Sequence, residues 1–324
     1  MAVILVGVGG EFDVGPSAKP VVVKVLVTGA SGMIGSSVCD ALLARGEEVV
    51  GLTRDPARAH STNPKVTWHA WNPTLERPPA EALDGVDRVV NLIGESINQR
   101  WTDDAKRRIR ASRIQATHNL VQAIAATDPR PGVLVSQSGV GYYGDRGDAI
   151  VDEETPAGSS FEAELCAEWE AAATEAEKAG LRVVVTRTCP VLDKRGGLLK
   201  QLLLPFKLGV GGPIAGGDQY LPWIHIDDEV GVLLWALDDE RVSGAINAAS
   251  PGPVTNRDFA RTLGRVLHRP AVVPAPKLAL KALLGGELAE TVSGGQRAIP
   301  RRALDLGFEF RHPKLEDALR AALA

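Results

Sequence analysis

The sequence has few cysteines, little net charge and no long apolar run. Its cysteines, Cys39, Cys166 and Cys189, are odd in number and widely spaced along 324 residues, which disfavours a disulfide framework or a zinc site. We therefore predict free thiols in a reducing cytoplasm and no bound metal. The formal net charge of −4 provides no general basic surface, so nucleic acid is not an expected partner.

A membrane partner is not expected either. No stretch of about 18 consecutive apolar residues occurs, as a transmembrane helix would require. The opening segment, MAVILVGVGGEFDVGP, is apolar at its start but has no basic beginning and no clear cleavage site. We interpret residues 1–20 as a short N-terminal extension, and not as an export signal.

From Val21 onwards, β-branched runs alternate with segments of helical periodicity. The runs are VVVKVLVTG, EEVVGLTR, KVTWHAW, VDRVVNLIG, GVLVSQS and LRVVVTRT. The clearest helical segment starts near Thr102, where Thr-Asp-Asp suits a helix N-terminus. Such alternation implies right-handed crossovers and a parallel sheet with helices on both faces. The predicted fold class is α/β, a doubly wound parallel sheet.

After about residue 190 the sequence becomes rich in glycine and proline, as in KRGGLLKQLLLPFKLGVGGPIAGGDQ. This change predicts a smaller lobe over the C-terminal edge of the sheet, where ligands bind in such folds. We expect a dinucleotide-binding domain at 21–192 plus about 224–250, and a substrate lobe with a small C-terminal domain at 193–223 plus 251–324.

A glycine loop follows the first strand. VLVTGASGMIG places Gly29, Gly32 and Gly35 between a strand and a helix. Glycine at the first position permits a tight turn, at the second a close approach to a pyrophosphate, and at the third close packing of helix on strand. The helix N-terminus offers unpaired N–H groups to the phosphates. The strand-loop-helix setting predicts a dinucleotide site.

The end of the second strand indicates which dinucleotide is bound. An NAD site usually has an acidic residue here, whose carboxylate would repel a 2′-phosphate. This strand ends in Thr53 and Arg54, which suit a phosphate, so we predict NADP(H) in preference to NAD(H). Asp55 is a competing ribose ligand, although Pro56 indicates that the chain turns away there. Arg54 as a solvated surface charge is the other alternative.

Further motifs follow in order: NLIGESINQRW, SRIQATHNLV, SQSGVGYYG, CAEWE, WIHIDD, PVTN and GQRAIP. From about Val21 to the C-terminus, this series resembles the SDR39U1-type family, an epimerase-like subgroup of the atypical short-chain dehydrogenases/reductases. The resemblance implies an extended-type Rossmann fold, NADPH binding, and a small-molecule substrate held between the Rossmann part and a C-terminal lobe. It specifies no substrate. Helix pairing, which is frequent in the superfamily, allows a homodimer.

The chain departs from the family pattern at RTCPVLDKRGG, where a glycine and a valine are usual after Arg-Thr. Cys189 and Pro190 therefore reshape a loop expected near the nicotinamide. The loop motif and the resemblance together predict these cofactor contacts: Gly29, Ser31, Gly32, Met33, Ile34, Gly35, Thr53, Arg54, Ile93, Gly94, Glu95, Cys166 and Cys189.

The usual catalytic pair is missing. In short-chain reductases a tyrosine transfers the substrate proton, and a lysine four residues later lowers its pKa and holds the nicotinamide ribose. With Glu170 as the family's anchor, the tyrosine position falls on Glu162 and the lysine position on Cys166. Glu162 is a substitute acid/base, or else a solvated helix residue beside a small buried cysteine. Thiol chemistry between Cys166 and Cys189 is a further hypothesis.

Other candidates surround this pair. Ser138 ends a strand where the superfamily has its catalytic serine, so we expect it to bind a substrate hydroxyl or carbonyl. Tyr142, Tyr143 or water is the alternative proton donor, although a Tyr-Gly pair here is also a common structural feature. In WIHIDDEV, His225, Asp227 and Asp228 look like a metal or acid–base cluster, and helix capping by Asp227 or Asp228 is the favoured interpretation.

The basic segment AKRRIRASR spreads its charges around a helix, so most of them should be solvated, with one left to meet an anionic substrate group. The leading functional prediction is an NADP(H)-binding oxidoreductase or epimerase-like enzyme acting on a small hydroxyl- or carbonyl-bearing compound. The alternative is a non-catalytic regulatory or sensor protein that binds NADPH and acts through a partner.

Overall fold

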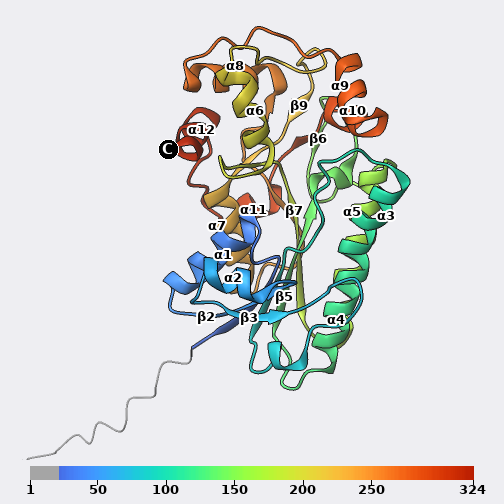
Figure 1. The fold of residues 1–324 in the computed structure, drawn as a ribbon, viewed down its shortest axis with the longest axis vertical. Helices are drawn as coiled ribbons and strands as arrows, with labels where there is room; N and C mark the ends of the chain where they lie inside the picture. The colour runs from blue at the N-terminus through green and yellow to red at the C-terminus, as the bar shows by residue number, and fades with distance from the viewer. Residues whose placement is uncertain (1–21) are drawn as a thin grey trace, which may run out of the picture.

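The computed structural model describes residues 22–324, so the predicted N-terminal extension lies outside the described residues. At its centre is a sheet of seven strands in the order β11-β7-β5-β4-β1-β2-β3 (Figure 1). Every neighbouring pair in this sheet is parallel. The strands are β1 (Lys24–Thr28), β2 (Glu48–Thr53), β3 (Thr67–Ala70), β4 (Arg88–Asn91), β5 (Val133–Gly139), β7 (Arg182–Thr188) and β11 (Gly244–Ala248). The predicted doubly wound α/β fold is confirmed.

The central strands are apolar because helices cover both of their faces. β1 is buried over its last four residues, and β7 is buried at all but its two ends. Strands covered on both faces need apolar side chains on both, which explains the continuous valine-rich runs. The strand order reverses between β1 and β4. Ligands of such folds bind at this switch point, beyond the carboxyl ends of the strands.

Two helical layers enclose the sheet (Figure 1). On one face α1 (Met33–Ala44) packs against α7 (Ile226–Asp238), and on the other α4 (Ala116–Ala126) packs against α5 (Phe161–Thr174). α3 (Asp103–Arg110) continues through a π-helical segment, η2 (Ala111–Gln115), directly into α4. The shorter helices of this part are α2 (Pro56–Thr62), η1 (Ala80–Ala82), η3 (Val140–Tyr143) and η4 (Glu175–Ala179).

A second core lies above the carboxyl edge of the sheet. Its helices are α6 (Gly197–Lys207), α8 (Asn256–Leu267) and α12 (Leu315–Leu323). They enclose large buried side chains, among them Phe206, Trp223 and Phe259. Short ladders join β8 (Val191–Leu192) to β10 (Ile224–His225) and β9 (Tyr220–Leu221) to β12 (Val254–Thr255). The predicted division into two units stays a prediction.

The C-terminal part of the chain also returns to the main sheet. α9 (Lys277–Leu284) and α10 (Gly286–Ser293) pack on each other near α3 and α5 (Figure 1). The chain then pairs β13 (Arg297–Ala298) with β6 (Ile150–Val151) and packs α11 (Arg301–Asp305) against β11. Asn247 of β11 donates from Nδ2 to the backbone oxygen of Ile299, and Arg302 donates to that of Ala245.

No helix among residues 22–324 combines the length and apolar character needed to cross a membrane.

Candidate functional site

The glycine loop lies at the carboxyl end of β1. Gly29 has a φ of +65°, and a Cβ there would lie 2.7 Å from the backbone oxygen of Leu92. At Gly35 a Cβ would lie 2.2 Å from the backbone oxygen of Gly29. Only glycine therefore permits this turn and this packing of α1 on β1. Gly32 is the N-cap of α1 and has no side chain to cap the helix, which leaves its first N–H groups available to an anion.

The neighbouring predicted contacts line the same loop. Ser31 is exposed, whereas Met33 and Ile34 are half-buried. A Cβ at Gly196 would lie 2.7 Å from the sulfur of Met33. Arg195 donates from Nη2 to Ser37 Oγ at 2.8 Å. The segment that follows β8 thus lies against the start of α1.

The end of β2 presents a basic surface. Arg54 is exposed, and so is Arg58 on α2; neither takes part in an ion pair among residues 22–324. Asp55 is the N-cap of α2, and its carboxylate accepts from the backbone N–H of Arg58 at 3.1 Å. The Thr53 hydroxyl accepts from the Asp55 backbone N–H at 3.3 Å. Asp55, the competing ribose ligand, is therefore occupied as a helix cap.

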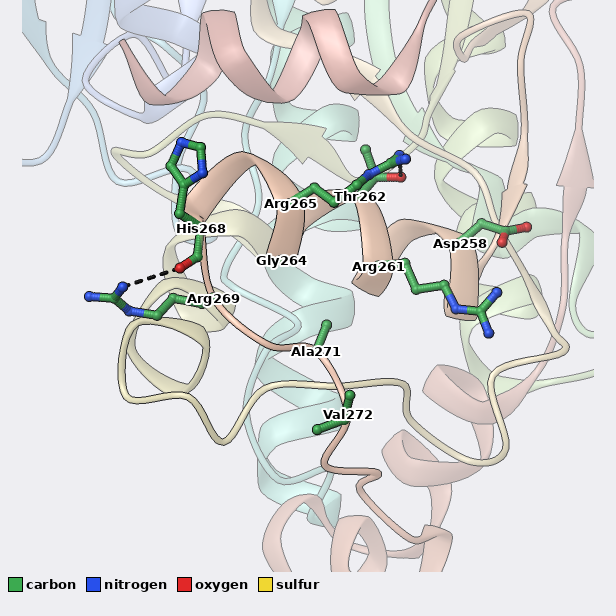
Figure 2. A pocket seen from close by; sticks show the side chains of 9 residues that line it. All are labelled: Asp258, Arg261, Thr262, Gly264, Arg265, His268, Arg269, Ala271 and Val272. Atoms are coloured by element: carbon green, nitrogen blue, oxygen red, sulfur yellow. Dashed lines mark hydrogen bonds between the residues drawn. The ribbon is translucent and has the colours of Figure 1, made fainter.

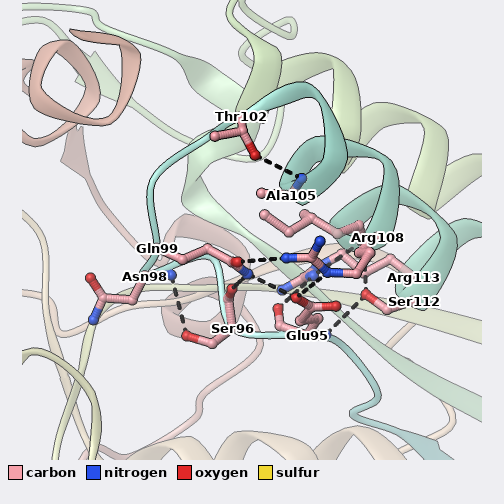
Figure 3. Close-up of polar contacts among 10 residues, drawn as sticks. Glu95, Ser96, Asn98, Gln99, Thr102, Ala105, Arg108, Ser112 and Arg113 are labelled. Carbon is pink, nitrogen blue, oxygen red and sulfur yellow. Dashed lines mark hydrogen bonds and ion pairs between the residues drawn. The ribbon is translucent and has the colours of Figure 1, made fainter. Parts of the chain in front are cut away.

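The loop after β4 is fixed from the α3–η2 helix (Figure 3). Ile93 is half-buried and Gly94 exposed. The backbone N–H of Glu95 donates to Ser112 Oγ at 2.9 Å, and the Glu95 carboxylate accepts from Arg108 Nε at 3.2 Å. Gln99 also donates to this carboxylate. The predicted cofactor contacts Ile93, Gly94 and Glu95 thus form one held segment beyond β4.

Ser138 belongs to a buried polar network. Its hydroxyl donates to Glu170 Oε1 at 2.8 Å. Arg187 binds the same carboxylate with two hydrogen bonds of 2.9 Å, and its Nη1 donates to the Tyr143 hydroxyl at 3.1 Å. Tyr143 in turn donates to Asn247 Oδ1 at 2.6 Å. This arrangement ties the ends of β5, β7 and β11 to α5.

The two tyrosines have different surroundings. Tyr143 is fully buried, and this burial raises the pKa of its phenol well above the ordinary value, against the effect of Arg187. Tyr142 is half-buried, and the Arg187 guanidinium lies 3.5 Å from the centre of its ring. Tyr143 is therefore held in the frame of the site, whereas Tyr142 is the more accessible of the two.

Glu162 lies in the wall of a cavity of about 260 Å³ between α5 and α10. A Cβ at Gly141 would lie 2.3 Å from Glu162 Cδ, so glycine at 141 makes room for this carboxyl. Burial raises the pKa of Glu162, and the nearby Arg113 opposes the rise. The cavity is lined by Trp101, Gly144, Asp145, Ser160, Phe161, Glu162, Glu287, Glu290, Thr291, Gly294 and Gln296.

The three cysteines are free and buried. Cys166 lies one turn after Glu162 on α5, and a Cβ at Gly139 would lie 3.7 Å from its sulfur. Burial raises the pKa of Cys166 to about 12 and that of Cys189 well above 9.0. Neither thiol is poised as a thiolate nucleophile.

Glu229, in the first turn of α7, was not among the residues expected from the sequence. It has no exposed surface. Its Oε1 accepts from the Thr188 hydroxyl at 2.9 Å, and its Oε2 has no hydrogen-bond partner in the described structure. Burial raises the pKa of Glu229 to about 8. In the sequence Glu229 is the third of three acidic residues in the first turn of α7, after Asp227 and Asp228, so nothing there distinguishes it as buried.

The His225 cluster closes the start of α7. His225 Nδ1 accepts from the backbone N–H of Asp227 at 3.1 Å, and Asp228 accepts from the backbone N–H groups of Arg311 and His312. One ligand atom each of His225, Asp227 and His312 lies within 4.8 Å of the others. The predicted capping by Asp227 or Asp228 is therefore wrong: His225 is the N-cap of α7, Asp228 binds the backbone of the C-terminal segment, and Asp227 contacts His312 Nε2 at 3.0 Å.

A larger and more open hollow, of about 780 Å³, lies beside α8 (Figure 2). Arg261, Arg265, His268 and Arg269 surround it. It contains none of the predicted cofactor or catalytic residues, so it is separate from the site at the sheet edge.

Two family models match the chain. Residues 25–249 match the NAD dependent epimerase/dehydratase family. The chain belongs to this family. Residues 275–322 match a domain of unknown function, DUF1731. This epimerase/dehydratase family member thus carries the small C-terminal domain that the resemblance implied.

Relatives cover nearly the whole chain. The family member is 39% identical over 309 residues to the SDR39U1 homolog, chloroplastic, of Arabidopsis thaliana, covering 95% of this chain and 88% of the plant protein. It is 37% identical to the human epimerase family protein SDR39U1, covering 93% of this chain and 100% of the human one. The resemblance to the SDR39U1-type family is confirmed. The predicted cytoplasmic location stays a prediction.

Solved structures share the fold. A crystal structure of human SDR39U1 (isoform 2) with NADPH matches with a TM-score of 0.82 at 36% identity, covering 92% of this chain and 98% of that chain. A UDP-glucuronic acid 4-epimerase from Bacillus cereus, solved with NAD, matches with a TM-score of 0.74 at 19% identity, covering 92% of this chain and 95% of the other. At that identity the likeness concerns the fold alone.

Proposed function

We propose that this family member is an NADP(H)-dependent oxidoreductase or epimerase-like enzyme of the atypical short-chain class, acting on a small hydroxyl- or carbonyl-bearing compound. One observation carries the proposal. At a single sheet edge, a glycine cradle at the start of α1 accompanies a cavity whose wall contains the Glu162 carboxyl. The glycine cradle suits a dinucleotide, and the cavity suits a reacting substrate.

The residues at the start of α1 fit a pyrophosphate. Side chains at Gly29 and Gly35 would fill the space between the turn, β4 and the helix, so this cradle depends on their absence. The uncapped N-terminus of α1 supplies N–H groups and the positive end of a helix dipole. Human SDR39U1, which has been solved with NADPH, supports the same assignment.

A 2′-phosphate accounts for the basic end of β2. Arg54 and Arg58 are both exposed, and the carboxylate of Asp55 is turned to the backbone of α2. A guanidinium binds phosphate through charge-assisted hydrogen bonds. This is the basis for proposing NADP(H) in preference to NAD(H).

The nicotinamide of the bound cofactor would supply or accept a hydride. The accompanying proton needs a group close to the substrate oxygen. Glu162 fits this role because it lies in the cavity wall and burial raises the pKa of its carboxyl from the ordinary 4.5. Ser138 and Tyr143 support the frame of the site through Glu170 and Asn247, and Tyr142 is the second candidate donor.

The cavity lining narrows the class of substrate. Its charged members are all acidic: Asp145, Glu162, Glu287 and Glu290. Glu287 and Glu290 pair with lysines that lie outside the lining. The described lining therefore offers no positively charged side chain to bind a diphosphate. Trp101 and Phe161 pack edge to face, with ring centres 5.1 Å apart. We therefore propose a small, uncharged or cationic substrate with an apolar part, and not a nucleotide sugar.

A second candidate function rests on the buried state of the superfamily's serine. The Ser138 hydroxyl donates its hydrogen bond to Glu170, so in this arrangement it cannot donate one to a substrate carbonyl. A protein that binds NADPH without turnover, and acts through a partner, would need no such hydroxyl.

The test is equilibrium binding of NADPH and NADH to the purified chain, followed by loss of nicotinamide absorbance as aldehydes, ketones and nucleotide sugars are added. We expect tighter binding of NADPH and oxidation by an uncharged carbonyl compound. Binding without turnover by any compound would support the sensor protein. No binding of either nucleotide would overturn the cofactor assignment.

A further inference from the structure

Arg113 belongs to the basic segment whose charges the sequence places around a helix, yet it is half-buried. It stands in the middle of η2, the π-helical segment between α3 and α4. π-helical turns within α-helices frequently occur at functional sites. Its Nη1 donates to the backbone oxygen of Glu95 at 2.9 Å, and Figure 3 shows its side chain directed at this loop. The guanidinium therefore lies beside the predicted cofactor segment after β4.

Two further contacts fix its position. A Cβ at Gly94 would lie 2.9 Å from Arg113 Cζ, so the guanidinium is in contact with the backbone there. On the other side, Arg113 Cζ lies 5.1 Å from the ring centre of Trp169, within the range of a cation–π contact. Arg113 is thus packed between the β4 loop and α5.

The charge of Arg113 acts on the two α5 positions where the catalytic pair is missing. Glu162 and Cys166 are four residues apart on α5 and share one face. Burial raises the pKa of both side chains, and in both cases the Arg113 guanidinium acts in the opposite direction. The helix itself carries no lysine four residues after Glu162, so the positive charge that acts on this carboxyl comes from η2.

The guanidinium also has donors to offer. Arginine carries five N–H donors and stays charged in proteins. The hydrogen bonds that Arg113 makes within residues 22–324 both start at Nη1, to the backbone oxygens of Glu95 and Ile109. Its Nε and Nη2 donate to no protein acceptor in that part of the chain.

We infer that Arg113 is the positioning cation of this site. It replaces, from η2, the lysine that short-chain reductases carry on α5. Its guanidinium binds the nicotinamide-ribose half of the cofactor beside Gly94. This inference rests on the proposed NADP(H) function and adds a residue to it.

The test compares NADPH with adenosine 2′,5′-bisphosphate, which lacks the nicotinamide half, by calorimetry on the full chain. Arg113→Gln keeps a donor for the Glu95 backbone oxygen and loses the charge, whereas Arg113→Lys keeps the charge. Arg107→Gln is the matched control, because Arg107 is an exposed neighbour on α3 that pairs with Asp104 and not with the β4 loop. Thermal unfolding of each variant reports whether the loop and helices remain folded.

For Arg113→Gln we expect NADPH binding to weaken about tenfold, since a lost charge-assisted hydrogen bond is of this size. Binding of the bisphosphate should change less than about twofold, and Arg113→Lys should recover most of the NADPH affinity. Equal loss of both ligands, or wild-type NADPH affinity in Arg113→Gln, would overturn the inference. Failure of the wild-type chain to bind even the bisphosphate would instead overturn the proposed cofactor.

Discussion

Replacing Glu229 by glutamine should remove a loss of folding stability that this residue causes as pH rises. Burial raises the pKa of this carboxyl from 4.5 to about 8. In the unfolded chain the group loses its proton near its ordinary pKa, whereas in the folded chain it keeps the proton up to about pH 8. The unfolded state therefore binds fewer protons between these values, so this residue makes the wild-type protein less stable as pH rises through that window.

The size of the effect follows from the two pKa values. Each tenfold difference in proton affinity between the folded and unfolded states is worth about 1.4 kcal/mol, so the full window is worth up to about 5 kcal/mol. Glutamine retains an oxygen for the Thr188 hydroxyl, which now donates to Glu229 at 2.9 Å, and it does not ionise. Glu229→Gln should thus gain free energy of unfolding relative to wild type as pH rises from about 5 to about 8.

Urea unfolding followed by tryptophan fluorescence at several pH values measures this difference directly. Glu48→Gln, at an exposed position on β2, is the control for loss of one carboxylate from the surface. If Glu229→Gln and wild type showed parallel pH profiles, the carboxyl would be ionised in the folded protein and the argument from burial would be wrong.

Three other predictions test the site. Glu162→Gln should lower turnover by about 10² to 10⁴-fold, the usual contribution of a general acid or base, while the NADPH dissociation constant stays within about twofold; unchanged turnover would remove Glu162 from the mechanism. Arg54→Ala should weaken NADPH binding about tenfold and leave NADH binding unaltered, and an equal effect on both would contradict a 2′-phosphate contact. Tyr143→Phe should lower the free energy of unfolding by about 1–3 kcal/mol, because Asn247 and Arg187 each lose a hydrogen-bond partner. Tyr142→Phe should change it by less than about 0.5 kcal/mol. Equal effects of the two substitutions in thermal or urea unfolding would refute this distinction.

The sequence sufficed for the features that depend on local chain geometry. Gly29 and Gly35 had to be glycine because a turn and a helix approach the neighbouring backbone there, and the spacing alone predicts this. The valine-rich runs predict a sheet buried on both faces for the same local reason. The identity of the family likewise followed from short motifs in order.

The contacts between distant segments could not be predicted in this way. Ser138 ends its strand at the expected place, but its bond to Glu170 depends on how α5 lies over the sheet. Arg113 reads as one charge among several on a helix, and only the π-helical segment brings it to Gly94. Glu229 could not be recognised because its burial depends on the packing of α7 against β7.

The return of the C-terminal segment to β6 and β11 has an evolutionary consequence. Glu153, which follows β6, accepts from the backbone N–H groups of both Asn247 and Arg302, so three stretches of chain meet at one carboxylate. A lobe interleaved with the sheet in this manner cannot be grafted onto another dinucleotide-binding domain by fusion at one point. Exchange of the C-terminal segment would remove the contacts of Ile299 and Arg302 with Asn247, Glu153 and Ala245, whereas single substitutions on the α10 side of the cavity wall leave these contacts in place.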